Sequence, residues 1–408
     1  MRSATRWIIA VSIIVPGIYP DAKAATTEVK DYSYFLEKLV DLDGLPVLSE
    51  GIQGKQFSSY DRASRYDEAS GKYIQWDANG DAGKYISVDP RTQEALMAEI
   101  DGPGCIWRIW SANPTGKIRF YLDGDKKPTY QFDFDGLFAG KVPGFPRPLI
   151  WQRKVDLGGN NPASNCYMPI PFAKSCKVTM DRPHNRLYYH IGYSTFPKDW
   201  KIKTFSLERT PAEEATLQRV CELLSNCGRD PQPVEDMKIS EKSVVLDPGR
   251  QAFWTYDEGP ATIRQFHAKA TSQDRWARRK VLLQMYWDGD QTPAVEAPIG
   301  DFFGDAWDEA TYRSLPMGIT DYLNYCYWRM PFGKSARMVI TNQGKRPVKV
   351  HYKISYTPGP LTTGTTYFHA KWRRDRNSSV FDYPMLECVG RGKFVGAVLF
   401  PDNILGGW

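Results

Sequence analysis

The sequence predicts a mostly β protein with two tandem jelly-roll domains, each a β-sandwich, and a few short helices. Its 33 glycines and 29 prolines interrupt the 408 residues too often for a helical bundle. Apolar and polar residues alternate over short runs that end at turn-forming residues, which is typical of strands that bury one face. Similar segments also return in the same order roughly 160 residues further along, which indicates a duplicated domain.

The first 24 residues predict a cleavable secretory signal peptide. Arg2 and Arg6 precede an apolar run over residues 7–18, and Ala22–Ala24 offers a cleavage site. The run is short for a membrane span, although a retained membrane anchor stays open as the alternative because two prolines blur the end of the run.

The first jelly-roll domain is expected over residues 25–208. An early helix begins at Tyr32, and its Phe35, Leu36 and Leu39 should pack against a sheet. This helix is interpreted as structural, because its apolar side chains recur at helical spacing.

Short strands should follow in this domain. Ile118–Leu122 alternates apolar and polar residues, and Asp123–Asp125 contains the Asp-Gly pair of a hairpin turn. Further strands are expected at Val178–Met180 and Tyr189–Tyr193. Antiparallel strands of this length, joined by turns, predict a sandwich.

Residues 209–240 should form a helix and a linker. Thr210 can cap the helix, Pro211 suits its first position, Glu213 completes a capping box and Gly228 ends it. The expected apolar stripe consists of Leu217, Val220, Cys221 and Leu224.

The second jelly-roll domain, over residues 241–408, is predicted from its likeness to the first and is expected to be incomplete at its C-terminus. Chance would rarely produce four similar pairs in one order. The pairs are GPGCIWRIW from Gly102 and GPATIRQFH from Gly259, YLDGD from Tyr121 and YWDGD from Tyr286, NCYMPIPF from Asn165 and YCYWRMPF from Tyr325, and YYHIGYSTF from Tyr188 and HYKISYTPG from His351.

Cysteine count and charge exclude several classes of function. Seven cysteines leave at least one unpaired, and Cys166 and Cys326 should be buried, whereas Cys221 and Cys227 are candidates for a disulfide. No metal-ligand spacing occurs, so neither a metal nor a cofactor is expected. The net charge of +6 is dispersed among acidic residues, which argues against a nucleic-acid partner.

Two stretches with carboxylates are candidates for chemistry. Asp61 lies beside Arg62 and between Tyr60 and Tyr66, a mixture that suits a carbohydrate pocket and equally an ordinary loop ion pair. A second stretch, residues 295–304, holds Glu296 and Asp301 beside aromatic residues. It predicts either a sugar site, where an apolar wall raises the pKa of an acid, or a strand with a polar outward face followed by a turn that Asp301 caps.

A third candidate is the stretch from Thr366, which contains His369, Trp372 and Arg373. Such a stretch is typical of a strand edge with solvated arginines. Its histidine and basic side chains also suit contact with an anionic or polyhydroxylated ligand.

The motifs SSYDR, GPGCIWRIW, GDFFG, YWRMPFGKSARM and YFHAKWRRD, in this order, resemble the family catalogued as domain of unknown function 2961. Its characterised members form glycoside hydrolase family 172 and act on furanosides such as fructofuranose and D-arabinofuranose linkages. The resemblance extends from about Ser58 to the last residue. It implies a double jelly roll, a homo-trimer or hexamer, a retaining mechanism without a metal, and an oligo- or polysaccharide with furanose sugars as substrate.

The family continues after a stretch like GKFVGAVLF with W-G-E-G-D-E and then G-T-G-T-E-D-Y, whose glutamates we interpret as the acid/base and the nucleophile. Neither acidic segment occurs in these 408 residues. The expectation is therefore a chain without the catalytic pair, with its catalytic residues unknown. A truncated gene model, a split gene and a decayed or binding-only protein are the three alternatives.

Together these observations predict a carbohydrate-active protein related to retaining furanosidases. It should be secreted or periplasmic and free of the membrane after signal cleavage. Asp61, Arg62, His369 and Arg373 are the predicted substrate contacts, because of their positions in family-like motifs. The alternative is a non-catalytic carbohydrate-binding or scaffolding protein.

Overall fold

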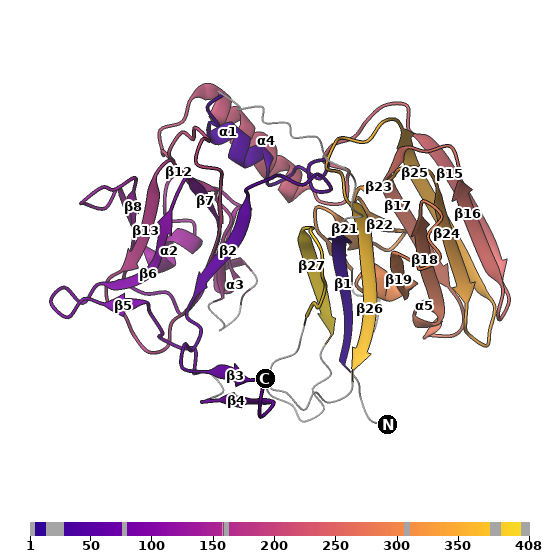
Figure 1. Cartoon of the computed structure of the whole chain (residues 1–408), viewed down its shortest axis with the longest axis horizontal. Coiled ribbons are helices and arrows are strands. Elements are labelled where there is room, and N and C mark those ends of the chain that lie inside the picture. Colours follow the sequence, from indigo (N-terminus) through magenta and orange to yellow (C-terminus); the bar gives the residue numbers. More distant parts are fainter. Residues whose placement is uncertain are drawn as a thin grey trace. The chain divides into compact units, whose positions relative to one another are not determined.

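The computed structural model describes residues 5–13, 28–75, 80–156, 158, 163–305, 311–375 and 385–400. The chain divides into two compact units. The first sandwich comprises Pro20–Val40 and Ser49–Ser225, and the second comprises Met1–Tyr19, Asp41–Leu48 and Asn226–Trp408. Each unit contains sheets packed face to face (Figure 1). The predicted fold class, mostly β with two tandem jelly-roll sandwiches, is confirmed.

The first sandwich has a six-stranded sheet in the order β10-β11-β7-β14-β2, with β12 beside β7, and a five-stranded sheet in the order β5-β6-β13-β8-β9. A separate hairpin is formed by β3 and β4. The strands are β2 (Gln53–Ser58), β3 (Arg65–Asp67), β4 (Lys72–Ile74), β5 (Ser87–Val88), β6 (Ala95–Asp101), β7 (Gly104–Ala112), β8 (Lys117–Leu122), β9 (Tyr130–Asp133), β10 (Ile150–Gln152), β11 (Ser164–Cys166), β12 (Ile170–Phe172), β13 (Ser175–Met180) and β14 (Tyr188–Thr195).

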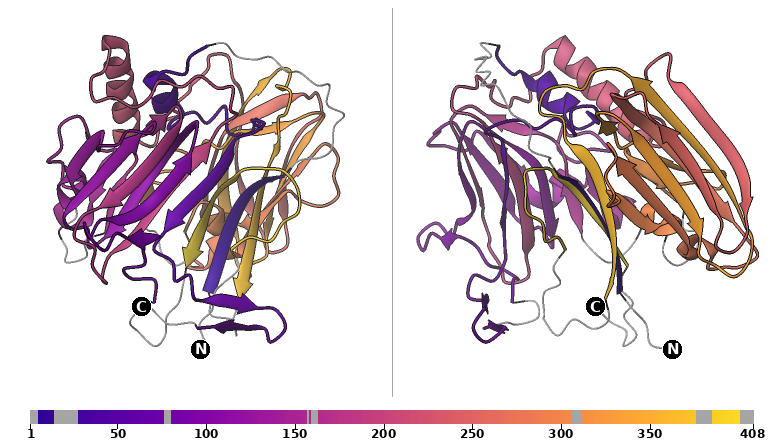
Figure 2. Two further views of the ribbon diagram at one scale, coloured as in Figure 1. Left: turned by 60° about the vertical axis from the view of Figure 1, so that its left-hand side comes forward. Right: turned by 45° about the vertical axis from the view of Figure 1, so that its right-hand side comes forward.

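The second sandwich has two seven-stranded sheets, in the orders β16-β24-β18-β19-β26-β1-β27 and β15-β25-β17-β22-β21-β20, with β23 beside β17. Figure 2 shows the ribbon from two further sides. β19 and β26 run parallel. The strands are β1 (Thr5–Ile13), β15 (Lys238–Leu246), β16 (Gln251–Tyr256), β17 (Ala261–Thr271), β18 (Val281–Trp287), β19 (Val295–Pro298), β20 (Tyr312–Arg313), β21 (Met317–Ile319), β22 (Asn324–Cys326), β23 (Met330–Phe332), β24 (Ala336–Asn342), β25 (Val348–Pro358), β26 (Tyr367–Asp375) and β27 (Phe394–Phe400).

The strand orders of the two sandwiches correspond. The series β6-β13-β8-β9 matches β16-β24-β18-β19, and β2-β14-β7-β11-β10 matches β15-β25-β17-β22-β21. The predicted hairpin turns also correspond, since Asp123 and Asp288 both have positive φ, of 54° and 55°. Asp123 accepts the backbone N–H groups of Lys174 and Ser175 at the start of β13, and Asp288 accepts those of Gly333, Lys334 and Ser335 just before β24. The repeat in the sequence is therefore a repeat in topology and in turn chemistry.

In the described part of the chain, six helices accompany the sheets: α1 (Tyr32–Glu37), α2 (Phe134–Phe138), α3 (Arg153–Asp156), α4 (Pro211–Ser225), α5 (Ala277–Lys280) and α6 (Ile299–Phe302). No helix among the described residues is both long and apolar enough to cross a lipid bilayer. In α1, Phe35 and Leu36 are fully buried as predicted, whereas Leu39, just beyond the helix, is partly exposed.

The capping box of α4 is confirmed. The Thr210 N–H donates to Glu213 Oε2 at 2.8 Å, and the Glu213 N–H donates to Thr210 Oγ1 at 3.2 Å. Glu213 also accepts bonds from Lys203 Nζ and from the Tyr32 N–H. Because α1 begins at Tyr32, one carboxylate joins α1 to α4.

A short stretch of early chain belongs to the second sandwich. The backbone N–H and hydroxyl of Thr366 both donate to the Pro46 carbonyl, and the Leu48 N–H donates to Gly364 at 3.0 Å. Residues Asp41–Leu48 are therefore anchored beside the start of β26 in the second sandwich. In the sequence they lie between the two segments of the first sandwich, Pro20–Val40 and Ser49–Ser225.

Two sequence predictions need correction. Cys221 and Cys227 are both free thiols, so the proposed disulfide is wrong, whereas Cys166 and Cys326 are buried as predicted. Asp301 does not cap a turn, because it is fully buried in α6 and forms an ion pair with Arg279 at 2.8 Å.

Glu296 and residues Thr5–Ile13, both singled out in the sequence, lie in strands of the second sandwich. Glu296 is partly exposed on β19, between the buried Val295 and Ala297, which agrees with the polar outward face. Residues Thr5–Ile13, which lie within the predicted signal peptide, form β1 between β26 and β27. The signal peptide itself stays a prediction.

Candidate functional site

The outer surface of the six-stranded sheet in the first sandwich carries a cluster of aromatic and hydrogen-bonding side chains. On β7, Ile109 and Ser111 point into the core, so Trp110 between them lies on the outer side. Its register partners are Asn165 on β11 and His190 on β14. We call the surface formed by Arg108, Trp110, Asn165, Tyr167 and His190 the open face.

Two hydrogen bonds fix a guanidinium and an amide side by side on the open face. Arg108 donates from Nε and Nη2 to Asn165 Oδ1, at 3.1 and 2.9 Å. The Asn165 NH2 group donates to no described residue, so it is available to a ligand. Tyr167, which is 40% exposed, adds an aromatic ring and a hydroxyl at the same edge. This arrangement supplies donors and an apolar surface for a polyhydroxylated molecule.

His190 packs against Trp110, with ring centroids 4.8 Å apart. Burial lowers the pKa of His190, the positive charge of Arg108 lowers it further, and Asp81 opposes both effects. The imidazole is therefore neutral at neutral pH, where it can both donate and accept a hydrogen bond.

The predicted contact Asp61 lies in the loop after β2, whose last residue, Ser58, is the register partner of His190. Its carboxylate accepts the Ala63 N–H at 3.1 Å and lies 3.7 Å from Lys84 Nζ. Asp61 is thus near one edge of the open face, and its cationic neighbour is Lys84.

The predicted contact Arg62 is turned back onto its own loop. Its guanidinium donates to the carbonyls of Tyr60 and Ser58, at 3.3 and 3.1 Å, and lies 4.7 Å from the Tyr60 ring centroid. Burial raises the pKa of Tyr189 to about 12, and a hydrogen bond from Arg62 opposes that rise. Arg62 therefore stabilises its own loop through backbone carbonyls and the Tyr60 ring, and the ion-pair partner of Asp61 is Lys84.

The second sandwich carries the equivalent surface, and there it is covered. The register places Tyr325 and Lys353 on either side of His267, as Asn165 and His190 flank Trp110. Tyr327, the counterpart of Tyr167, is only 5% exposed and donates its hydroxyl to the Gly228 carbonyl at 2.9 Å. Leu42 packs against Tyr325 and Tyr327. We call this surface the covered face.

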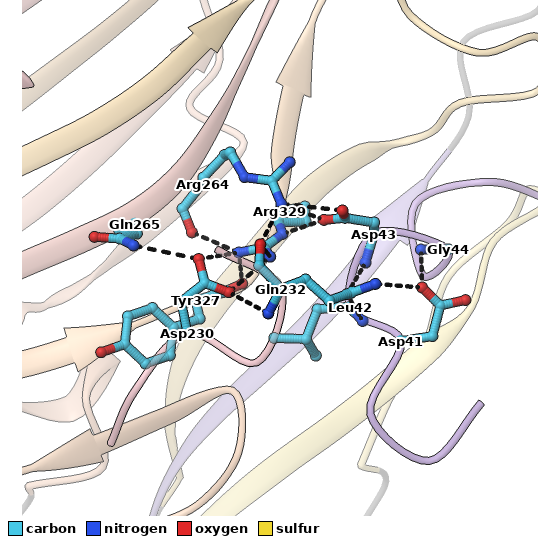
Figure 3. Close-up of polar contacts among 10 residues, drawn as sticks. All are labelled: Asp41, Leu42, Asp43, Gly44, Asp230, Gln232, Arg264, Gln265, Tyr327 and Arg329. Carbon is cyan, nitrogen blue, oxygen red and sulfur yellow. Dashed lines mark hydrogen bonds and ion pairs between the residues drawn. The ribbon is translucent and has the colours of Figure 1, made fainter. Parts of the chain in front are cut away.

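An ionic network centred on two buried arginines fastens the covering segments in place (Figure 3). Arg329 donates to Asp230 from both Nη atoms, at 3.0 and 2.8 Å, and to Asp43 from Nε at 2.5 Å. Arg264 donates to both oxygens of Asp43 and to the Gln232 carbonyl. Both arginines are more than nine-tenths buried. Such a network holds its geometry because every lost contact would leave a charge unpaired.

The electrostatics of the network agree with its role. Burial raises the pKa of Asp230, but the hydrogen bonds and the charge of Arg329 outweigh it and hold the pKa below the ordinary value. Asp230 also accepts a bond from Gln265, the counterpart of Arg108. The covered face is therefore closed by the chain's own charged groups, and the open face is the candidate functional site.

The other two predicted contacts, His369 and Arg373, lie on β26 of the second sandwich. Phe368 and Ala370 face the core, so His369 and Arg373 share the outer side of the strand with Lys371. Burial and then the charge of Lys371 lower the pKa of His369. The structure thus assigns the four predicted contacts to two different units, two to each.

Sequence reasoning missed Trp110 and His190. The signal that could have found His190 is parity, because it lies between Tyr189 and Ile191, which have the apolar character of core positions. Trp110 carries that signal on one side only, from Ile109, because Ser111 on its other side is polar. Among the described residues, no three His, Cys, Asp or Glu side chains gather closely enough to hold a metal ion.

Two family models match the chain. The model described as the GH172 first β-sandwich domain matches residues 50–213, and the model described as GH172 domain-like matches residues 236–354. A search of curated proteins found no match.

The solved structures to which the chain is similar are distant from it in sequence and in superposition. The triple jelly-roll protein of an archaeal virus is 7% identical with a TM-score of 0.19, over 64% of this chain and 55% of that chain. The chain therefore spans about half the length of that protein. The major capsid protein P2 of bacteriophage PM2 is 8% identical with a TM-score of 0.20, over 76% and 100% of the two chains. A conserved protein of unknown function from Pseudomonas aeruginosa PAO1, PA5104, is 9% identical with a TM-score of 0.15, over 66% and 87%.

The two matched regions fall on the two sandwiches and together take in most of the chain. Their order agrees with the duplicated topology, and neither region depends on the distant solved structures. On this ground the chain belongs to the GH172 family and is a glycoside hydrolase-related protein.

Proposed function

We propose that the open face binds a glycan that contains furanose sugars. The observation that carries the proposal is the contrast between two equivalent surfaces. One is closed by an ionic network centred on two buried arginines, and the other presents Trp110, His190 and the Arg108–Asn165 pair with an unused amide donor. Membership of the GH172 family supports a carbohydrate as the ligand.

The finer proposal is a protein related to retaining furanosidases. Retaining hydrolysis needs two carboxyl groups about 5–5.5 Å apart, one as nucleophile and one as acid/base. We assign recognition to the open face and leave that carboxyl pair unassigned. The alternative is a binding or scaffolding protein without hydrolysis.

The setting of the proposed activity comes from the sequence and the family resemblance. We propose that the protein is exported to the periplasm or secreted after cleavage near Ala24. We further propose a homo-trimer or hexamer as the working assembly, without nucleic acid or membrane as partners.

Calorimetric titration with arabinofuranose and fructofuranose oligosaccharides tests the proposal. The Trp110→Ala and Asn165→Leu variants should bind at least about tenfold more weakly than wild type, because each loses an aromatic or hydrogen-bonding contact. Tyr322→Ala, which removes an aromatic ring that is 88% exposed on the second sandwich, is the matched control and should bind normally.

The same samples separate the alternatives. Release of free sugar from aryl furanosides would establish hydrolysis and reject the binding-only alternative. Binding without release would favour the alternative. Equal affinity for furanose oligosaccharides in wild type, Trp110→Ala and Asn165→Leu would overturn the open face as the site.

A further inference from the structure

The second sandwich contains a polar cavity of about 230 Å3, distinct from both the open and the covered face. It is larger than the ~30 Å3 share of one liquid water and smaller than the ~300–1,000 Å3 of typical drug-sized sites. A single small molecule suits this volume better than an oligomer. The cavity is lined by Lys269, Ala270, Arg278, Asp305, Thr311, Ile319, Thr320, Asp321 and Asn324.

Asn324 is the informative residue of this cavity. It is 8% exposed, and its side chain lines the cavity. It pairs with the fully buried Ala268 in the sheet, and its amide forms no hydrogen bond with any described residue. An amide that lines a cavity and forms no hydrogen bond within the described protein is open to water or to a ligand in that cavity.

The charges around the cavity balance. Arg278 Nε lies 2.9 Å from Asp305 Oδ2, and that carboxylate is almost completely buried. On the other side Lys269 Nζ donates to the backbone carbonyl of Asp321, whose own carboxylate offsets the ammonium charge. The lining thus contains two cationic side chains, Lys269 and Arg278, and two anionic ones, Asp305 and Asp321. Because these charges cancel, the cavity has no net charge that would favour a charged ligand.

We propose that this cavity binds a small neutral polyhydroxylated molecule of monosaccharide size. Its hydroxyl groups would both donate to and accept from the Asn324 amide, and the Arg278–Asp305 pair would supply a further donor and acceptor. The apolar part of the lining, Ala270 and Ile319, accommodates the carbon skeleton. The proposal is independent of the open face and goes beyond the proposed function.

The test uses the full chain, with D-fructose, D-arabinose and the anion D-arabinonate as probes. Binding is followed by calorimetry and by the shift of the melting temperature. We expect saturable binding of a neutral sugar and none of arabinonate. The Asn324→Leu variant should fold, because replacing an unpartnered buried amide by an apolar side chain is nearly neutral or stabilising, and it should bind about tenfold more weakly.

Two controls separate this site from the proposed function. Asn185→Leu makes the same substitution at an exposed position of the first sandwich and should bind as wild type. Asn324→Leu should also weaken monosaccharide binding about tenfold in the Trp110→Ala background, where the open face has lost its aromatic contact. A loss in Trp110→Ala with retention in Asn324→Leu would overturn the cavity and leave the open face as the monosaccharide site. The proposal for the cavity would also be overturned if the wild type bound no sugar saturably or preferred arabinonate. If Asn324→Leu fails to fold, the Asn324→Ser variant takes its place in each comparison.

Discussion

Single residues decide which of the two equivalent surfaces is accessible. In the first sandwich Trp107 is partly buried against Phe35 of α1, whereas its counterpart in the second sandwich is Arg264, which binds Asp43. An apolar contact in one copy is thus an ionic contact in the other. The arginine at this position needs an anionic partner, which is Asp43, 221 positions away in the sequence.

Arg329→Met should destabilise the protein strongly. Asp230 would be left buried without its cation, and removing one partner of a buried pair costs about 3–5 kcal/mol. Urea denaturation measures the change in the free energy of unfolding. Arg337→Met is the matched control, because Arg337 stacks on Tyr286 at 4.1 Å at the surface of the same sandwich, and its loss should cost about 1 kcal/mol or less. Equal costs in the two variants would contradict the importance of the network.

At the scale of elements, α4 shows how a local signal gains long-range importance. Its capping box follows from Thr210 and Glu213 alone. The further bonds from Lys203 and from the first residue of α1 make Glu213 a junction between two helices. Burial raises the pKa of Glu213, yet these hydrogen bonds, Lys203 first, hold it below its ordinary value.

Glu213→Ala should therefore cost more than the loss of an ordinary helix cap, about 2–3 kcal/mol against a typical ~1 kcal/mol. The backbone amides of Tyr32 and Thr210 should lose protection in hydrogen exchange, because both donate to this carboxylate. Glu214→Ala removes the neighbouring acid, whose contact with Arg209 is 3.5 Å long and partly exposed, and should cost less than about 1 kcal/mol. Unchanged protection at Tyr32 would contradict the junction.

The sequence predicts those elements whose determinants are local. The alternation at Ile118–Leu122 and the Asp-Gly turn after it give β8 and its hairpin, and the repeat gives β18 in the second copy. The covered face was beyond such reasoning, because Asp43 and Arg329 are 286 positions apart and neither carries a local pattern. The predicted contact Asp61 lies in the loop after β2 and Arg62 holds that same loop, and their role as substrate contacts stays a prediction.

At the scale of the whole molecule, buried titratable groups give the stability a predictable response to acid. Burial first, and then the charge of Lys353, lower the pKa of His267 to about 4 from an ordinary value of 6.5. The unfolded chain therefore binds a proton at a higher pH than the folded chain does. This contribution to stability is complete above pH 6.5 and is lost as the pH falls toward 4.

His267→Gln tests this response, because glutamine keeps polarity and does not titrate. The wild type should lose as much as about 3 kcal/mol between pH 7 and 4 through His267, and the variant should lose correspondingly less. Below about pH 4 both proteins should weaken further as Asp230, whose pKa is depressed, takes up its proton. Urea denaturation at several pH values measures the free energy of unfolding in both pH ranges. If this free energy fell equally with pH in wild type and His267→Gln, the contribution assigned to His267 would be contradicted.

The placement of residues Asp41–Leu48 in the second sandwich has a consequence for biosynthesis. Asp43 leaves the ribosome 286 residues before Arg329, a delay of roughly 15–60 s at ~5–20 residues per second. The first sandwich can fold as its strands are synthesised one after another. Residues Asp41–Leu48 stay solvated until Arg264 and Arg329, which bind Asp43, have been synthesised. A fragment that starts at Asn226 would carry two buried arginines without Asp43. The two halves of this protein are thus repeats in architecture but not separable modules.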